Sequence, residues 1–137
     1  RGVPQDYLQA AIWTRKAAEQ GDADAELALG GMYETGQGVP QDFEQAVAWT
    51  RKAAEQGHAG AQFDLGGRYE TGRGVPKDDV QAHKWINLAA SRATGETQAT
   101  YATSRDAIAG RIPPEQVAEA QKEARAWAEA FERRQKK

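Results

Sequence analysis

Few side chains in this sequence have the chemistry of a nucleophile. There are two serines, Ser91 and Ser104, and no cysteine. An acylating serine of the β-lactamase type is followed three residues later by lysine, but here those positions hold Thr94 and Ala107. The missing cysteines exclude disulfides, thiolate metal sites and a thiol nucleophile, and they do not identify the compartment. We therefore expect no enzyme activity, and the localisation stays undetermined.

The two histidines offer little more. Asp79 and His83 are four residues apart in a predicted helix, a spacing that could hold a metal, but no second histidine accompanies them. We expect an exposed polar pair there, with no metal and no cofactor. His58 follows Gly57 at the start of a predicted helix, where the matching position of another repeat holds Asp22. Its predicted role is at the helix end.

Tryptophans and glycines recur in ways that suggest structure. Trp13, Trp49 and Trp85 are each 36 residues apart. A stacking platform for bases or sugars is one interpretation, but identical placement in every repeat favours core positions. The glycines of TGQGVP and TGRGVP lack a following GK[ST] and a preceding strand, so we interpret them as turn residues and not as a phosphate loop.

A repeat of 36 residues organises the chain. GVPQD begins at Gly2 and Gly38, and GVPKD begins at Gly74. The first two copies differ at only 11 positions. Each copy predicts two helices, in the first copy over about 6–20 and 22–35, because small and apolar residues recur at three- and four-residue steps. A helical pair of this size buries too little surface alone, so the repeats must share one core.

Composition limits the partners. Hydrophobic residues make up 39% and charged residues 28% of the chain, and the formal net charge is −2. This composition predicts a folded chain, and no apolar stretch is long enough to cross a membrane. No basic cluster precedes the extreme C-terminus, so nucleic acid is not an expected partner.

The repeat pattern GVPxDxxxAxxWxxKAAxxGxAxAxxxLGxxYExG resembles the SEL-like repeat family, a close relative of the tetratricopeptide repeat, over residues 2–93. The resemblance implies an all-α fold, a right-handed α-solenoid of stacked antiparallel helix hairpins with about seven helices. The segment after Trp85, with RDAIAGRIPPEQVAEAQKEARAW, is similar to the ending of many bacterial members, which suggests a bacterial source.

We divide the chain into repeats over 1–110, in units that start near Gly2, Gly38 and Gly74, and a capping helix with a frayed tail over 111–137. The cap is predicted because Pro113 and Pro114 suit a helix start, and an apolar stripe follows them. At the other end, the chain looks cut from a longer array. The helix over 6–20 would then expose apolar surface and could mediate self-association.

The differences between the first two repeats predict a binding surface. Six of the 11 differing positions lie in the second helix, and two of them place a charge where the first repeat has an uncharged residue, Ala28 to Asp64 and Met32 to Arg68. We expect these positions to be exposed, since a packed core would not tolerate such changes. An ordinary variable solvent face is the alternative. The resemblance implies that this helix lines a concave groove, bordered by Asp24, Leu27, Gly31, Glu34, Thr35, Phe63, Asp64, Gly67, Arg68, Glu70 and Thr71.

These observations predict a scaffold that binds another protein or a peptide in the groove. A structural spacer, or a regulatory module such as an immunity-type inhibitor, is the alternative. A scaffold should present clustered apolar and charged residues in the groove, whereas a spacer should be uniformly polar there.

Overall fold

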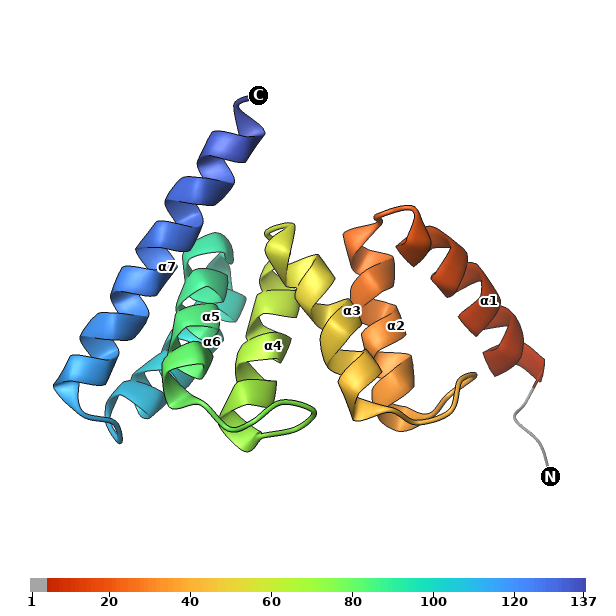
Figure 1. Cartoon of the computed structure of the whole chain (residues 1–137), viewed down its shortest axis with the longest axis horizontal. Helices are drawn as coiled ribbons and strands as arrows, with labels where there is room; N and C mark the ends of the chain where they lie inside the picture. The colour runs from red at the N-terminus through yellow and green to blue at the C-terminus, as the bar shows by residue number, and fades with distance from the viewer. Residues whose placement is uncertain (1–4) are drawn as a thin grey trace.

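The computed structural model describes residues 5–137, which form seven helices and contain no strand (Figure 1). The helices are α1 (Gln5–Glu19), α2 (Ala23–Thr35), α3 (Phe43–Glu55), α4 (Ala59–Thr71), α5 (Asp79–Arg92), α6 (Gly95–Ala109) and α7 (Pro114–Gln135). This confirms the predicted all-α solenoid. The unit start predicted near Gly2 lies outside the described residues.

Polar side chains fix where the repeat helices begin. Asp42 accepts hydrogen bonds from the backbone N–H groups of Glu44 and Gln45, and Asp78 accepts one from Gln81, all at 3.1 Å. These bonds satisfy amides that have no partner within the helix. His58 caps α4 in the same way, through its Nδ1 atom 3.1 Å from the backbone nitrogen of Ala61. The predicted role of His58 at a helix end is confirmed.

Two glycines allow the connections between repeats to pack on the preceding helix. Gly38 and Gly74 have φ angles of +81° and +82°, where other L-residues are strained. A Cβ atom on Gly38 would lie 2.4 Å from the carbonyl oxygen of Tyr7, and one on Gly74 would lie 2.5 Å from that of Phe43. The GVP segment therefore needs glycine for its conformation and for its close contact.

Helices follow one another in a stacked series, each packed on the next from α1 to α6 (Figure 1). Small residues permit the close approach within each pair. A Cβ atom on Gly30 of α2 would lie 2.5 Å from the Thr50 hydroxyl and 3.0 Å from the Ala46 carbonyl oxygen of α3. Gly66 makes the equivalent approach to Ile86 and Ala82 of α5. The repeat thus positions its helices through side chains that must stay small.

The helix α7 closes the C-terminal end. It begins at Pro114, as predicted, and packs against α5 (Figure 1). Ala120 and Ala124 of its apolar stripe are buried, and Trp127 meets Trp85 in an edge-to-face contact with ring centroids 5.7 Å apart. The last residues extend the helix to Gln135 with exposed side chains.

The three repeated tryptophans differ in burial, which corrects their assignment to the core. Trp85 is 1% exposed, Trp49 is half-buried and Trp13 is 64% exposed. Their burial differs because, of the three rings, only Trp85 lies under α7. Identical placement in a repeat does not give identical burial near the end of a stack.

Candidate functional site

A hollow on the predicted binding side lies between α2 and α4, and we call it the α2–α4 hollow. It encloses about 480 Å³. Six of the eleven predicted groove residues line it, and Gly60 and Arg73 complete it. The six are Glu34, Phe63, Asp64, Gly67, Arg68 and Thr71. The structure therefore brings together five of the six predicted residues of α4, with Glu34 of α2.

An ion network forms one wall of this hollow. Arg68 extends from α4 to α2, where its Nη2 atom pairs with Glu34, and its Nε atom lies 2.8 Å from Oδ1 of Asp64. The second carboxylate oxygen of Glu34 lies 2.5 Å from Nη1 of Arg73. Two carboxylates and two guanidinium groups thus balance in charge, which makes the wall polar without a large net field.

Arg68 corrects the expectation that the charge-changing positions are exposed. Its side chain is only 4% exposed, while Asp64 and Met32 are half-buried and Ala28 is exposed. The charge is tolerated because Asp64 and Glu34 lie beside it. Within the described part of the chain, Nη1 of Arg68 is buried and has no hydrogen-bond partner. The guanidinium therefore keeps unused donor capacity beside the hollow.

Burial and the nearby arginines shift the pKa values of the Asp64 and Glu34 carboxyl groups in opposite directions. Burial raises the pKa of Asp64, and the nearby Arg68 only partly opposes this. For Glu34, burial alone would also raise the pKa, but the bonds and charges of Arg73 and Arg68 hold it below its ordinary value. Glu34 is therefore the firmly ionised centre of the network, and Asp64 is the member closer to protonation.

An aromatic pair connects α4 to α6 beside the network. The rings of Phe63 and Tyr101 stack with centroids 4.3 Å apart and an interplanar angle of 15°. Phe63 also packs against the buried cluster of Ala82, Ile86 and Ile108. Phe63 therefore adds an apolar residue to the lining of the hollow.

The remaining five predicted residues lie outside the α2–α4 hollow. Asp24 pairs with Nε2 of His58 at 2.7 Å, Leu27 packs on the core, and Gly31 borders open space. Thr35 is exposed and donates to the carbonyl oxygen of Gly31, while Glu70 accepts from Arg111 at 3.0 Å. These residues follow the same side of α2 and α4 but do not form one site.

Sequence comparison missed Gly60, Arg73 and the aromatic partner Tyr101. Gly60 and Arg73 stand at differing positions, opposite Asp24 and Gln37 in the first repeat, so the comparison contained a signal for both. Tyr101 lies in α6, which lacks the repeat pattern. No internal comparison reaches it.

The predicted exposed pair of Asp79 and His83 is wrong. Asp79 bonds to Lys77 at 3.0 Å and to Arg111 at 3.3 Å, whereas His83 is 2% exposed. Burial, and to a lesser degree the Arg105 cation, lowers the pKa of His83, although Asp106 acts the other way. His83 is a buried, neutral core residue.

Two further features bear on the class of site. Across residues 5–137, no group of three or more histidine, aspartate and glutamate side chains is placed to hold a metal ion. In the same range, every helix is too short or too polar to cross a lipid bilayer.

Two solved structures are similar to this chain in fold. One is a protective antigen present in uropathogenic Escherichia coli strains that displays an SLR fold, with a TM-score of 0.84 and 34% identity over 98% of this chain. The other is a Sel1 repeat protein from Oxalobacter formigenes, with a TM-score of 0.63 and 39% identity over 69% of this chain. The match covers 29% and 39% of the lengths of those two proteins. Among curated proteins, no significant match is found.

Stacked helix pairs with a hollow on one side define an α-helical repeat protein of the kind that generally serves as an interaction scaffold. The model of the Sel1 repeat matches residues 1–22, 23–58 and 59–93. The chain belongs to the Sel1 repeat family, as its repeat pattern predicts. Each full match begins with the first residue of α2 or α4 and so pairs that helix with the tryptophan helix after it.

Proposed function

We propose that the protein binds a peptide or protein segment in the α2–α4 hollow. The observation that carries this proposal is the combination of Phe63 with the network of Asp64, Arg68 and Glu34 around one hollow. A structural spacer would not require an apolar side chain beside clustered charges. A ligand needs both, because the apolar contact gives affinity and the charges select orientation and partner.

The chemistry of the hollow describes its ligand. An apolar side chain would pack on Phe63, whose ring is stacked on Tyr101, and groups of both signs would meet Arg73 and Asp64. Because the network balances its own charges, a strongly acidic or basic ligand gains little. We expect an extended or helical segment with one apolar anchor beside mixed charges.

The first repeat supplies a test variant that the fold should accept. Phe63→Leu, Asp64→Ala and Arg68→Met together install the residues Leu27, Ala28 and Met32 of α2. We call this the exchange variant. A peptide library displayed on phage is selected on the wild-type protein, and enriched peptides are measured on both proteins by calorimetry.

Selected peptides should carry an apolar residue flanked by charges, bind in the micromolar range typical of small groove sites, about 1–100 μM, and bind the exchange variant at least tenfold more weakly. The opposite result is a selection that enriches nothing, or peptides with equal affinity for both proteins. Either would remove the α2–α4 hollow as a binding site and leave the spacer alternative.

A further inference from the structure

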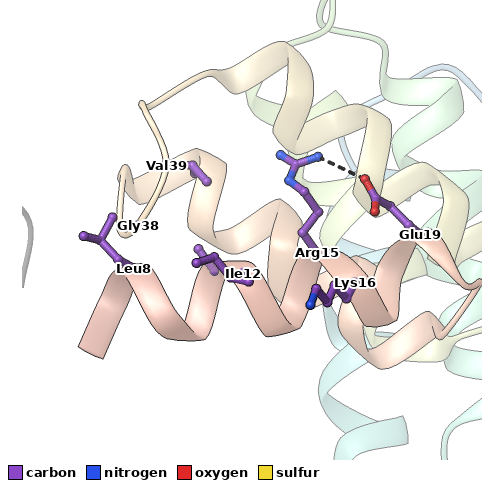
Figure 2. A pocket seen from close by; sticks show the side chains of 8 residues that line it. Leu8, Ile12, Arg15, Lys16, Glu19, Gly38 and Val39 are labelled. Atoms are coloured by element: carbon purple, nitrogen blue, oxygen red, sulfur yellow. Dashed lines mark ion pairs between the residues drawn. The ribbon is translucent and has the colours of Figure 1, made fainter. Parts of the chain in front are cut away.

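The N-terminal helix α1 borders a second hollow, which we call the α1 hollow. It encloses about 350 Å³ and is lined by α1 and by the loop after α2 (Figure 2). Leu8 and Ile12 of α1 form its apolar part together with Val39 of the loop (Figure 2). Leu8 is 39% exposed and Ile12 is 49% exposed, so this apolar surface is open to water.

A helix packed before α1 in the manner of the repeat would cover other residues. In α3, Ala46 and Thr50 are buried, and Gly30 of α2 approaches both of them. The matching residues of α1 are Ala10 and Thr14, which have the same identities. A helix like α2 placed before α1 would therefore contact Ala10 and Thr14.

Leu8 and Ile12 stand at positions that this packing leaves open. Their counterparts in α3 are Glu44 and Ala48, and both are exposed although α2 packs on α3. Leu8 and Ile12 would stay exposed under the same packing. Apolar residues at such positions indicate a contact outside the repeat stack.

The second repeat has a counterpart of this hollow on α3, which we call the α3 hollow. It encloses about 720 Å³, and the six residues of α3 that line it stand 36 residues after the six residues of α1 that line the α1 hollow. The α3 hollow has Glu44 and Ala48 in place of Leu8 and Ile12. Of the two equivalent hollows, the one on α1 is therefore the more apolar.

The two hollows also differ in the sign of their excess charge. The α1 hollow has two cations, Arg15 and Lys16, and one carboxylate, Glu19. The α3 hollow has two cations at the equivalent positions, but its lining includes three carboxylates, which are Glu26, Glu44 and Glu55. The α1 hollow is therefore suited to an apolar ligand with a negative charge, and the α3 hollow is not.

Lys16 is the cation that a ligand can use. Glu19 pairs with Arg15 at 3.8 Å, and Arg15 also donates to the hydroxyl of Tyr33. In the part of the chain that the structure describes, Lys16 has no ion pair, and its exposed amino group lies 4.8 Å from the centroid of the Trp13 ring. A carboxylate can therefore bind Lys16 without displacing an existing ion pair.

Leu8, Ile12 and Lys16 form a row with steps of four residues along α1. Each step rises about 6 Å along the helix axis, and two residues of an extended segment span about 6.6 Å. Side chains i, i+2 and i+4 of an extended segment would therefore follow the row. The hollow lies between this row and Val39, and an extended segment is narrower than a helix, whose diameter is about 10 Å.

We propose that the α1 hollow binds an extended segment of a partner protein with the pattern aliphatic–x–aliphatic–x–acidic. The two aliphatic side chains pack on Leu8 and Ile12, and the carboxylate pairs with Lys16. A second copy of the chain fits less well, because a two-fold contact would set the same positive patch against itself. The α1 hollow and the α2–α4 hollow share no lining residue, so this inference does not depend on the proposed function.

The probe is the peptide acetyl-Gly-Leu-Ser-Leu-Ser-Asp-Gly-amide, titrated into the complete chain and followed by the methyl signals in NMR spectra. We expect saturable binding with a Kd below about 1 mM. The methyl signals of Leu8, Ile12 and Val39 should shift. Those of Val47, which lines the α3 hollow, and of Val75, the counterpart of Val39, should stay in place.

Matched variants of the protein test the two parts of the hollow. Leu8→Glu with Ile12→Ala installs the residues that α3 carries at these positions, so the fold should tolerate both, and the peptide should bind at least tenfold more weakly. Lys16→Gln should weaken binding about two- to fivefold. The control is Lys52→Gln, which makes the same change one repeat later and should leave the affinity unchanged.

Matched peptides test the ligand pattern. A peptide with Asn in place of Asp should bind about two- to fivefold more weakly to the wild type, and it should not distinguish the wild type from Lys16→Gln. The rearranged peptide acetyl-Gly-Leu-Leu-Ser-Ser-Asp-Gly-amide, whose leucines point to opposite sides of an extended chain, should bind at least threefold more weakly. The exchange variant of the α2–α4 hollow should bind the probe as the wild type does, so this test is separate from that of the proposed function.

Four results would overturn the proposal. They are no saturable binding up to about 1 mM peptide, unchanged affinity in the Leu8→Glu, Ile12→Ala variant, and equal affinity of the wild type for the Asp, Asn and rearranged peptides. The fourth is a dimer in sedimentation that the Leu8→Glu, Ile12→Ala variant converts to a monomer, since that assigns the α1 hollow to a second copy of the chain.

Discussion

The helices α2 and α4 have the same length, begin at capped residues and end at left-handed glycines, yet several of their side chains differ in chemistry. On the core side both present the same residues, Leu29 and Gly30 in α2 and Leu65 and Gly66 in α4. At other positions, α2 carries Leu27 and Met32 where α4 carries Phe63 and Arg68. The shared residues hold the repeat together, and the differing residues make one repeat chemically distinct from the next.

Position along the stack also separates equivalent residues. Trp85 and Trp13 occupy the same place in their repeats, but Trp85 is buried under α7 and Trp13 is 64% exposed. Equal sequence therefore has unequal energetic weight at the two ends of the molecule.

The largest expected effect is the difference in stability between the Trp85→Ala and Trp13→Ala variants. Trp85→Ala should lower the free energy of unfolding by about 3–5 kcal/mol, because it leaves a cavity between α5 and α7. Trp13→Ala should cost less than about 1 kcal/mol, since its ring is largely in water. Urea unfolding of the three proteins measures both values, and equal losses would show that burial does not distinguish the two positions.

A pair of adjacent glycines should respond with opposite signs. Gly30→Ala should cost about 1–3 kcal/mol, because its methyl group would overlap Thr50. Gly31→Ala should stabilise the helix by about 0.5–1 kcal/mol, because nothing lies within 4 Å of the new Cβ atom. Thermal unfolding gives the sign of each change. Stabilisation by both would contradict the close approach of α2 to α3.

A smaller expected effect is a pH dependence of stability that comes from His83 of α5 and has no counterpart at Val47 of α3. His83 stands where α3 has Val47, and its pKa in the folded protein is lowered from 6.5. The unfolded chain therefore binds this proton at a higher pH than the folded protein does. As the pH drops through 6.5, the ordinary pKa of histidine, the free energy of unfolding falls. The melting temperature of wild type should therefore decrease more than that of His83→Val between about pH 7.5 and 5.5. Parallel profiles would mean that His83 titrates normally.

Much of the fold was predictable because the same pattern of residues recurs every 36 residues. The period gives the helices, Asp42 and His58 mark two helix starts, and Pro114 marks the last helix. The candidate site was predictable only in part. The positions of Phe63 and Arg68 follow from the differences between repeats, and six of the eleven predicted residues share one hollow.

The errors came from contacts that a two-repeat comparison does not contain. Arg68 is buried because Glu34 of the previous helix pairs with it, and a charge change alone does not show that pairing. His83 was misplaced because it was paired with its neighbour in sequence, although Val47 at the same repeat position indicates a core site. Trp13 was wrongly assigned to the core, because the burial of this repeated tryptophan depends on a covering helix. Of the three equivalent tryptophans, only Trp85 is covered by α7.

The most direct test of this account is the free energy of unfolding of the exchange variant, measured by urea denaturation at neutral pH. The account predicts a value within about 1 kcal/mol of wild type, because Phe63→Leu, Asp64→Ala and Arg68→Met install residues that the first repeat already uses. A loss above about 3 kcal/mol would contradict it, because the network of Arg68 would then be part of what holds the fold together and not a surface kept for binding.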